Sequence, residues 1–147
     1  MARTMHLGVE TYRAFAPADW TGQPPPGLEA RLAELLRSRF TWGLLAHIAG
    51  EPAGHVLMFP DWQPGGAVYL SHLFVRPAWW GTGLAAELHE AFLAEARGRG
   101  YRDARLHTPA GNARARRFYA RRGWRVSAPP KPWLGLPVVE HRLPLGR

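Results

Sequence analysis

Two glycines separated by one residue, Gly81 and Gly83, follow an apolar run and stand directly before a helical pattern. The first turn of a helix has backbone N–H groups without intrahelical partners, and glycine lets a phosphate approach them closely. The stretch from Trp80 to Ala85 therefore favours a binding loop for a phosphorylated ligand. A plain strand-to-helix turn would give the same short pattern. Neither the glycine-lysine phosphate loop nor the three-glycine dinucleotide fingerprint is present.

The elements on either side of this loop follow from hydrophobic periodicity. The apolar run 67–75 predicts a central strand that stops before Pro77. From Leu84 onward apolar residues recur at steps of three and four, which predicts a helix that ends at Gly98 or Gly100. Downstream, a strand is expected at 104–108, a helix at 113–122 between an Asn112 N-cap and a Gly123 stop, and strands at 124–127 and 138–143, separated by a proline-rich loop.

The N-terminal part of the chain carries weaker signals. Leucines at helical spacing predict an amphipathic helix from Leu28 to Phe40. Apolar runs at 42–48 and 54–59 flank a turn-forming stretch and predict a tight hairpin. A strand at 9–15 and a short helical turn at 16–20 complete the expected elements.

A second pattern follows the glycine loop at a suitable distance: Asn112-Ala-Arg-Ala-Arg-Arg-Phe-Tyr-Ala-Arg-Arg-Gly-Trp124. Together the two stretches resemble the GNAT superfamily of acyl-CoA-dependent N-acyltransferases. Its first motif reads Leu-x-Val-x-Pro and then Gln/Arg-x-x-Gly-x-Gly/Ala, and its second reads Asn-x-x-Ala-x-x-Phe/Leu-Tyr-x-x-x-Gly-Phe/Trp. The matching positions are Leu73, Val75, Pro77, Gly83, Ala85, Asn112, Ala115, Phe118, Tyr119, Gly123 and Trp124. One position departs, because Trp80 stands where the family has glutamine or arginine.

The resemblance implies a fold and a reaction. The expected fold is a mixed α/β single domain over 1–147, with a largely antiparallel sheet flanked by helices and splayed between the strands near Val75 and His107. The implied reaction moves an acetyl group from acetyl-CoA to a primary amine by direct attack. The acceptor would approach from the side opposite the cofactor, along the first helices, Trp20, Trp62 and the loop 129–137 with Trp133. Small-molecule amines, peptide N-termini and protein lysines remain open as acceptors.

The resemblance also implies which residues hold the cofactor. Pantetheine would pair as an extra strand with the backbone of Leu73, Phe74 and Val75. Backbone N–H groups of the glycine loop would hold the diphosphate, while Trp79 and Trp80 would pack on the core or cover the pantetheine. The full implied set is Leu73, Phe74, Val75, Trp80, Gly81, Thr82, Gly83, Leu84, Ala85, Asn112, Ala115 and Tyr119. Some of the arginines at 114, 116, 117, 121 and 122 could add phosphate contacts, although such a run is usually a solvated face.

Two proton transfers need side chains in this reaction. Tyr119 stands where many members carry a tyrosine that protonates the leaving thiolate, and its alternative role is an aromatic packed on an amphipathic helix. The base is less clear, because Ser71 occupies the position of the usual glutamate and is too weak a base alone. His72 is the preferred base, and His55 and His107 are further candidates on neighbouring strands. Each histidine could equally be an ordinary hydrogen-bonded strand residue.

Composition and motifs together limit the other functions that the chain could have. The net charge of +8 is carried almost wholly by arginine, with Lys131 as the sole lysine, and it reflects either codon preference or attraction to a polyanion. A basic nucleic-acid-binding domain is disfavoured by the two motifs, so no nucleic acid partner is expected. A non-catalytic acyl-CoA-binding sensor is the main rival, favoured by Ser71.

The remaining features concern compartment and partners. The chain has no cysteine, no apolar stretch of membrane-spanning length and no signal-peptide pattern, so we expect a cytoplasmic protein without membrane contact. The seven histidines show no ligand spacing, and no metal is expected. A homodimer is left open.

Overall fold

The computed structural model describes residues 18, 26–61, 66–133 and 135–146. The strand expected at 9–15 and, apart from residue 18, the turn expected at 16–20 lie outside this part of the chain. None of the described helices is long and apolar enough to cross a membrane.

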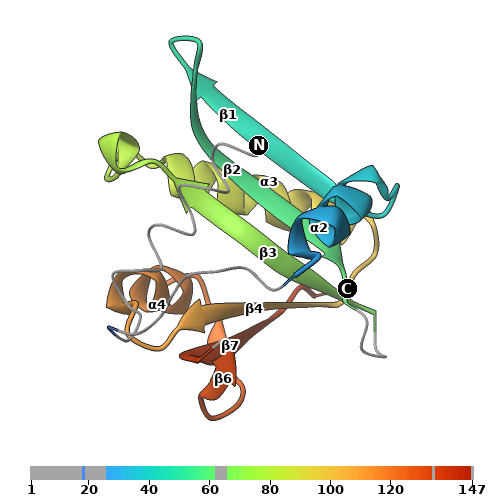
Figure 1. The fold of residues 1–147 in the computed structure, drawn as a ribbon, viewed down its shortest axis with the longest axis vertical. Helices are drawn as coiled ribbons and strands as arrows, with labels where there is room; N and C mark the ends of the chain where they lie inside the picture. The colour runs from blue at the N-terminus through green and yellow to red at the C-terminus, as the bar shows by residue number, and fades with distance from the viewer. Residues whose placement is uncertain (1–17, 19–25, 62–65, 134, 147) are drawn as a thin grey trace.

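One mixed sheet organises the described residues (Figure 1). Its seven strands run in the order β1-β2-β3-β4-β7-β5, with β6 paired to β7. Every pairing is antiparallel except that of β3 with β4. In chain order the elements are α2 (Leu28–Arg37), β1 (Trp42–Ile48), β2 (Glu51–Pro60), β3 (Ala67–Val75), the 3₁₀ turn η2 (Pro77–Trp79), α3 (Leu84–Gly98), β4 (Asp103–Pro109), α4 (Ala113–Ala120), β5 (Arg125–Val126), β6 (Lys131–Trp133) and β7 (Leu136–Pro144).

Most predicted elements agree with these bounds, and one is wrong. The central strand and the helix from Leu84 to Gly98 occur as expected, whereas α2 ends at Arg37, three residues before Phe40. The stretch 129–137 was expected to be a loop, but Lys131–Trp133 forms β6 and pairs with the start of β7. The prolines in this stretch argued against a strand, because proline lacks the N–H that a strand interior needs and is tolerated only at a sheet edge. The short hairpin was therefore not predicted.

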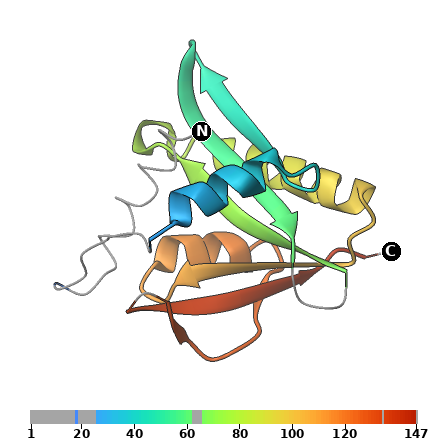
Figure 2. The same cartoon turned by 45° about the vertical axis from the view of Figure 1, so that its right-hand side comes forward.

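The hydrophobic core lies between the sheet and α3, which covers one face, while α2 crosses the other face (Figure 2). Alternate β3 residues such as Val68 and Leu70 point into this core, and α4 closes it with Phe118 and Tyr119. The Trp124 indole N–H donates to His89 Nε2 at 2.9 Å inside the core. That bond ties the end of the second motif to α3 and satisfies two buried polar groups.

Strands β3 and β4 separate soon after they meet. Their parallel pairing covers only residues 67–69 and 103–105, and beyond Tyr69 the two strands diverge (Figure 1). A bulge lies at the same point, because Leu57 and Met58 of β2 pair with His72 and Leu70, which leaves Ser71 as an extra residue. A bulge bends its strand and increases the local twist. The splay expected between Val75 and His107 is therefore confirmed, and it begins at Tyr69.

Candidate functional site

On the edge of β3 that faces the splay, β4 pairs only with residues 67–69, so the later residues of β3 have no strand partner there among the described residues. On the opposite edge, the Arg76 N–H donates to the Ala53 carbonyl of the β2 strand at 2.9 Å. Backbone groups of an antiparallel ladder alternate in direction, so Phe74 points toward β2, whereas Leu73 and Val75 point toward the splay. The Trp80 indole N–H donates to the Val75 carbonyl at 2.8 Å, which confirms that this carbonyl faces away from β2.

The glycine loop has the geometry of a phosphate cradle. Gly81 and Gly83 adopt φ values of 76° and 89°, which disfavour other residues. Apart from the adjacent residues of the chain, no described atom lies within 4 Å of where a Cβ would stand on either. Gly83 is the N-cap of α3 and has no side-chain cap bond, so the first-turn N–H groups remain available to a ligand. The loop is braced by the Thr82 hydroxyl, which donates to the Trp79 carbonyl at 2.6 Å. These features fit a bound diphosphate.

Trp80 links the loop to α4. Trp79 packs against the core as expected, but Trp80 is 45% exposed. The Arg114 guanidinium of α4 lies over the Trp80 ring, 3.9 Å from its centroid. A cation therefore lies beside the loop, although residue 80 itself supplies none.

Helix α4 begins at Ala113 as predicted and ends at Ala120, two residues before the predicted end at Arg122. The Asn112 side chain accepts from the Ala115 N–H at 3.0 Å, and Gly123 has a φ of 86° just past the helix end. The structure places Tyr119 in a buried aromatic cluster, with ring centroids 5.7 Å from Trp124 and 6.1 Å from His141. This packing agrees with the aromatic-core alternative, and it holds the phenol rigidly on the helix that flanks the splay.

His55, which is buried, and His72, which is partly buried, form a pair of rings on the face that α2 crosses. Their ring centroids are 5.7 Å apart, and among the described residues neither ring nitrogen of His55 has a hydrogen-bond partner. Burial lowers the pKa of His55 to about 4, with a further lowering by His72. Burial also lowers the pKa of His72. Both rings are therefore neutral near pH 7, and His72 lies beside the Ser71 bulge.

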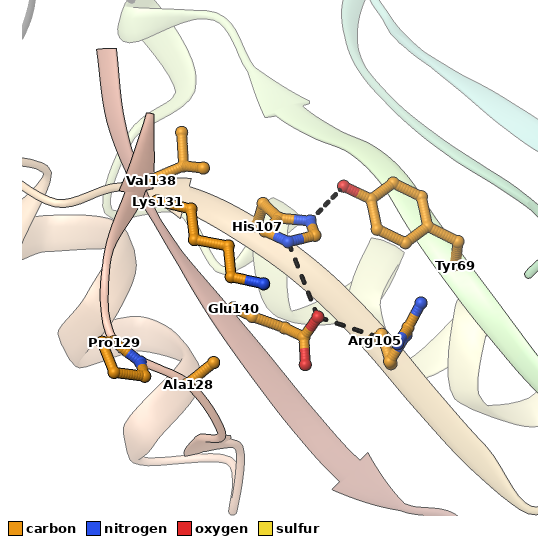
Figure 3. A pocket seen from close by; sticks show the side chains of 8 residues that line it. All are labelled: Tyr69, Arg105, His107, Ala128, Pro129, Lys131, Val138 and Glu140. Carbon is orange, nitrogen blue, oxygen red and sulfur yellow. Dashed lines mark hydrogen bonds and ion pairs between the residues drawn. The ribbon is translucent and has the colours of Figure 1, made fainter. Parts of the chain in front are cut away.

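A cavity of about 150 Å³ lies on the side of the sheet opposite α3, where the splay begins (Figure 3). The Tyr69 hydroxyl is 2.6 Å from His107 Nδ1, and His107 Nε2 is 3.7 Å from Glu140 Oε2. These three side chains come from β3, β4 and β7 and point toward one another in Figure 3. The lining residues are Tyr69, Arg105, His107, Ala128, Pro129, Lys131, Val138 and Glu140.

Hydrogen bonds hold Glu140 in its charged form. It accepts from the Ser127 hydroxyl at 2.6 Å and from Arg142 Nε at 3.1 Å. Burial alone would raise the pKa of Glu140, but these bonds and the nearby guanidinium of Arg105 outweigh it, so the pKa is lowered. Arg105 is itself buried and forms an ion pair with Asp61. The cavity thus contains a fixed carboxylate beside a partly buried imidazole.

The sequence-predicted site residues fall into two groups around the splay. The glycine loop and the β3 edge lie at its outer end. His107 lies near the point where β3 and β4 separate, after Tyr69 and Arg105, which we call the fork of the splay. Of the acceptor-side residues expected from sequence, Pro129 and Lys131 line the cavity, while Trp133 is not among its lining residues and is half exposed. Trp20 and Trp62 lie outside the described residues.

The two cavity side chains in contact with His107, Tyr69 and Glu140, were not predicted from the sequence. Tyr69 carries no motif, and only its alternation with the core residues Val68 and Leu70 could have placed it on this face. Glu140 lies opposite His107 only because β4 and β7 pair in that register. Nowhere in the described ranges do three histidine or acidic side chains gather in a way that could hold a metal ion.

Comparison with known proteins identifies the family to which this fold and site belong. The mixed sheet that opens next to a glycine-bearing helix start is the fold of a set of solved acetyltransferase structures. The model of the acetyltransferase (GNAT) family matches residues 9–124. The chain belongs to the GNAT acetyltransferase family. No curated protein gives a significant sequence match.

Solved structures share the fold at low sequence identity. A GNAT-family protein from Desulfovibrio desulfuricans is 23% identical, with a TM-score of 0.71 over 95% of this chain and 89% of its own. The ribosomal-protein-S18-alanine N-acetyltransferase from Escherichia coli is 18% identical, with a TM-score of 0.67 over 98% and 90%. A GNAT acetyltransferase from Elizabethkingia anophelis with acetyl-CoA bound is 14% identical, with a TM-score of 0.64 over 84% and 93%.

Proposed function

We propose that this protein binds acetyl-CoA in the splay between β3 and β4 and transfers its acetyl group to a primary amine by direct attack. One observation carries the proposal: the parallel pairing of β3 with β4 stops at Tyr69, and the open edge leads straight to the glycine loop. Family membership supports the same chemistry, as does the acetyl-CoA in the Elizabethkingia structure.

The described geometry supports a division of labour in cofactor binding. Leu73 and Val75 have the backbone groups that face the splay, so we assign the pantetheine amides to Leu73 and to the Val75 N–H, since the Val75 carbonyl already accepts from Trp80, while Phe74 faces β2 instead. The N–H groups of Gly81 to Ala85 would hold the diphosphate. Arg114, stacked on Trp80, would supply the phosphate-binding cation that position 80 lacks. Asn112 and Ala115 contribute by fixing the start of α4.

Bound acetyl-CoA supplies the thioester carbonyl that the amine attacks. Tyr119 is our candidate for the acid that protonates the departing sulfur, because a phenol donates its proton where negative charge develops. Ser71 and His72 lie at the bulge beside the start of the splay, and His72 is a candidate base on that strand. The neutral state that burial imposes on His72 is the state that a base requires.

The acceptor enters, in this proposal, through the cavity at the fork of the splay. Its volume of about 150 Å³ suits one aminoalkyl or N-terminal residue rather than a bulky ring system. The Escherichia coli neighbour acts on an alanine of a ribosomal protein, so a peptide N-terminus belongs in the acceptor panel. Short diamines and lysine peptides complete it.

Thiol release from acetyl-CoA, measured with and without each amine, tests the proposal. Amine-dependent release supports the transferase. The rival function is a non-catalytic acyl-CoA sensor, favoured by Ser71 at the usual glutamate position, and it predicts calorimetric binding of acetyl-CoA without release for any amine. If acetyl-CoA does not bind, both functions are wrong.

A further inference from the structure

The cavity at the fork of the splay contains a line of three titratable side chains from three adjacent strands. Tyr69 is the last β3 residue that pairs with β4, and His107 lies two residues beyond its partner Arg105. Glu140 of β7 is the register partner of His107. The line therefore runs from the point where β3 and β4 separate, across β4, to β7, as Figure 3 shows.

We propose that Tyr69, His107 and Glu140 form the proton relay that deprotonates the attacking amine. This inference rests on the proposed function and deepens it, because it names the groups that activate the acceptor. It also assigns a site for the acceptor nitrogen, next to the Tyr69 hydroxyl at the fork.

Charge sets the direction of the relay. Glu140 Oε2 lies 3.7 Å from His107 Nε2, too far for a hydrogen bond, and its negative charge favours the neutral tautomer that keeps the proton on Nε2. Nδ1 is then the acceptor, and the Tyr69 hydroxyl donates to it across 2.6 Å. A phenol oxygen is both donor and acceptor, so it can take a proton from an ammonium group as it gives its own to an imidazole.

The proton balance follows from this arrangement. One ammonium N–H bond breaks and its proton joins the Tyr69 oxygen, while the Tyr69 hydroxyl proton moves to His107 Nδ1. The phenol stays neutral and the imidazole becomes an imidazolium. The freed nitrogen lone pair forms the bond to the carbonyl carbon as the carbon–sulfur bond breaks. Of the two protons that the nitrogen loses, one leaves His107 to solvent and the other replaces the proton that Tyr119 gives to sulfur.

The charged groups around His107 allow its imidazole to accept a proton and release it again. Burial is the main cause that lowers the pKa of His107, and Glu140 opposes it, followed by the smaller effects of Arg105, Asp61 and Lys131. The ring is neutral at working pH, and the Glu140 carboxylate stabilises the imidazolium once it forms. His141, the next residue along β7, is also buried and neutral, since burial lowers its pKa.

His72 is the rival base, and its surroundings differ in one decisive respect. It packs against the buried ring of His55, and among the described residues no carboxylate pairs with it. A proton on His72 would therefore gain no stabilisation from a counter-charge, whereas a proton on His107 gains it from Glu140.

The experiment compares pH profiles of kcat/KM for amine acetylation in the wild type and in single variants of the whole protein. We expect His107→Gln to lower kcat by about 100- to 10,000-fold and to abolish the acid limb of the profile. Tyr69→Phe should lower kcat in the same direction. Glu140→Gln removes the charge that raises the pKa of His107, so its acid limb should move to lower pH while its plateau rate falls. His47→Gln, on an exposed β1 position, is the control and should match the wild type.

Calorimetric binding of acetyl-CoA and the melting temperature separate catalytic loss from misfolding. The relay requires unchanged acetyl-CoA affinity in all variants, and added imidazole should restore part of the rate of His107→Ala. The relay is wrong if His107→Gln keeps the wild-type profile, or if His72→Gln alone abolishes the acid limb. Should His107→Gln not fold, the Tyr69→Phe rate and the Glu140→Gln shift decide. A wild type that binds no acetyl-CoA would instead overturn the proposed function.

Discussion

Replacement of Arg114 by alanine should weaken acetyl-CoA binding without unfolding the protein. In the free protein the guanidinium stacks on Trp80, 3.9 Å from the ring centroid, and it is otherwise exposed. That stacking restricts its rotamers before the ligand arrives, so less side-chain entropy is lost when a phosphate binds. The cation–π contact exists in both states and largely cancels from the binding free energy.

The magnitude follows from exposure and charge. An exposed ion pair contributes up to about 1 kcal/mol, and a bidentate guanidinium–phosphate contact is about twice as strong. We therefore expect a loss of about 1 to 2 kcal/mol, which is about 5- to 30-fold in Kd. The double variant Trp80→Arg with Arg114→Ala moves the cation onto the loop, where the family usually carries it, and should regain most of that affinity.

Isothermal titration with acetyl-CoA at low and high salt measures these effects. The affinity of Arg114→Ala should depend less on salt than that of the wild type, because one phosphate contact is gone. Arg121→Ala, exposed at the other end of α4, is the matched control. A Kd for Arg114→Ala within about twofold of both wild type and control would refute the reasoning, since a bound phosphate should sense the loss of an adjacent cation.

Three further predictions concern the phenol, the buried histidine and the splayed strand. Tyr119→Phe should slow turnover by about 100-fold or more with little change in acetyl-CoA affinity, and an unchanged rate would remove Tyr119 from the mechanism. Because the pKa of His55 is lowered to about 4 in the folded protein, the unfolded chain binds this proton more tightly. The contribution of neutral His55 to the free energy of unfolding is therefore complete above pH 6.5, and the free energy of unfolding falls by about 3 kcal/mol as the pH drops toward 4. Denaturant titrations of His55→Leu should show a flatter pH dependence, and an identical slope would contradict this account. Gly54→Ala should lower the free energy of unfolding by about 1 to 3 kcal/mol, because its Cβ would lie 2.6 Å from the Phe74 carbonyl oxygen, whereas Gly98→Ala meets open space and should stabilise α3 slightly. Equal stabilities for the two glycine variants would show that β2 and β3 move apart freely.

Much of the fold could be predicted from local patterns in the sequence. Asn112, Gly123 and the periodicity from Leu84 to Gly98 each encode a helix boundary or face through short-range physics, and the structure has them where expected. The β6 hairpin was missed because Pro132 masks strand propensity at a sheet edge. Local patterns could not reveal it without the partner strand β7.

Local patterns likewise predict one part of the candidate site and not the other. The glycine loop is contiguous in sequence, so its backbone geometry could be anticipated. The link from Trp80 to Arg114 joins residues far apart in the chain, and it depends on where α4 docks. Likewise, Tyr69, His107 and Glu140 meet only through strand order and register, which no local spacing encodes.

Transfer of a labelled acetyl group is the most direct test of the central claim. The wild type would be incubated with acetyl-CoA carrying carbon-13 in its acetyl group and with a primary amine, and the protein, the amine and the free thiol would be analysed together. Direct attack predicts one labelled acetyl amide for each thiol released and no added mass on the protein. Thiol release without a labelled amide, or a labelled acetyl group on the protein in the absence of amine, would contradict the account.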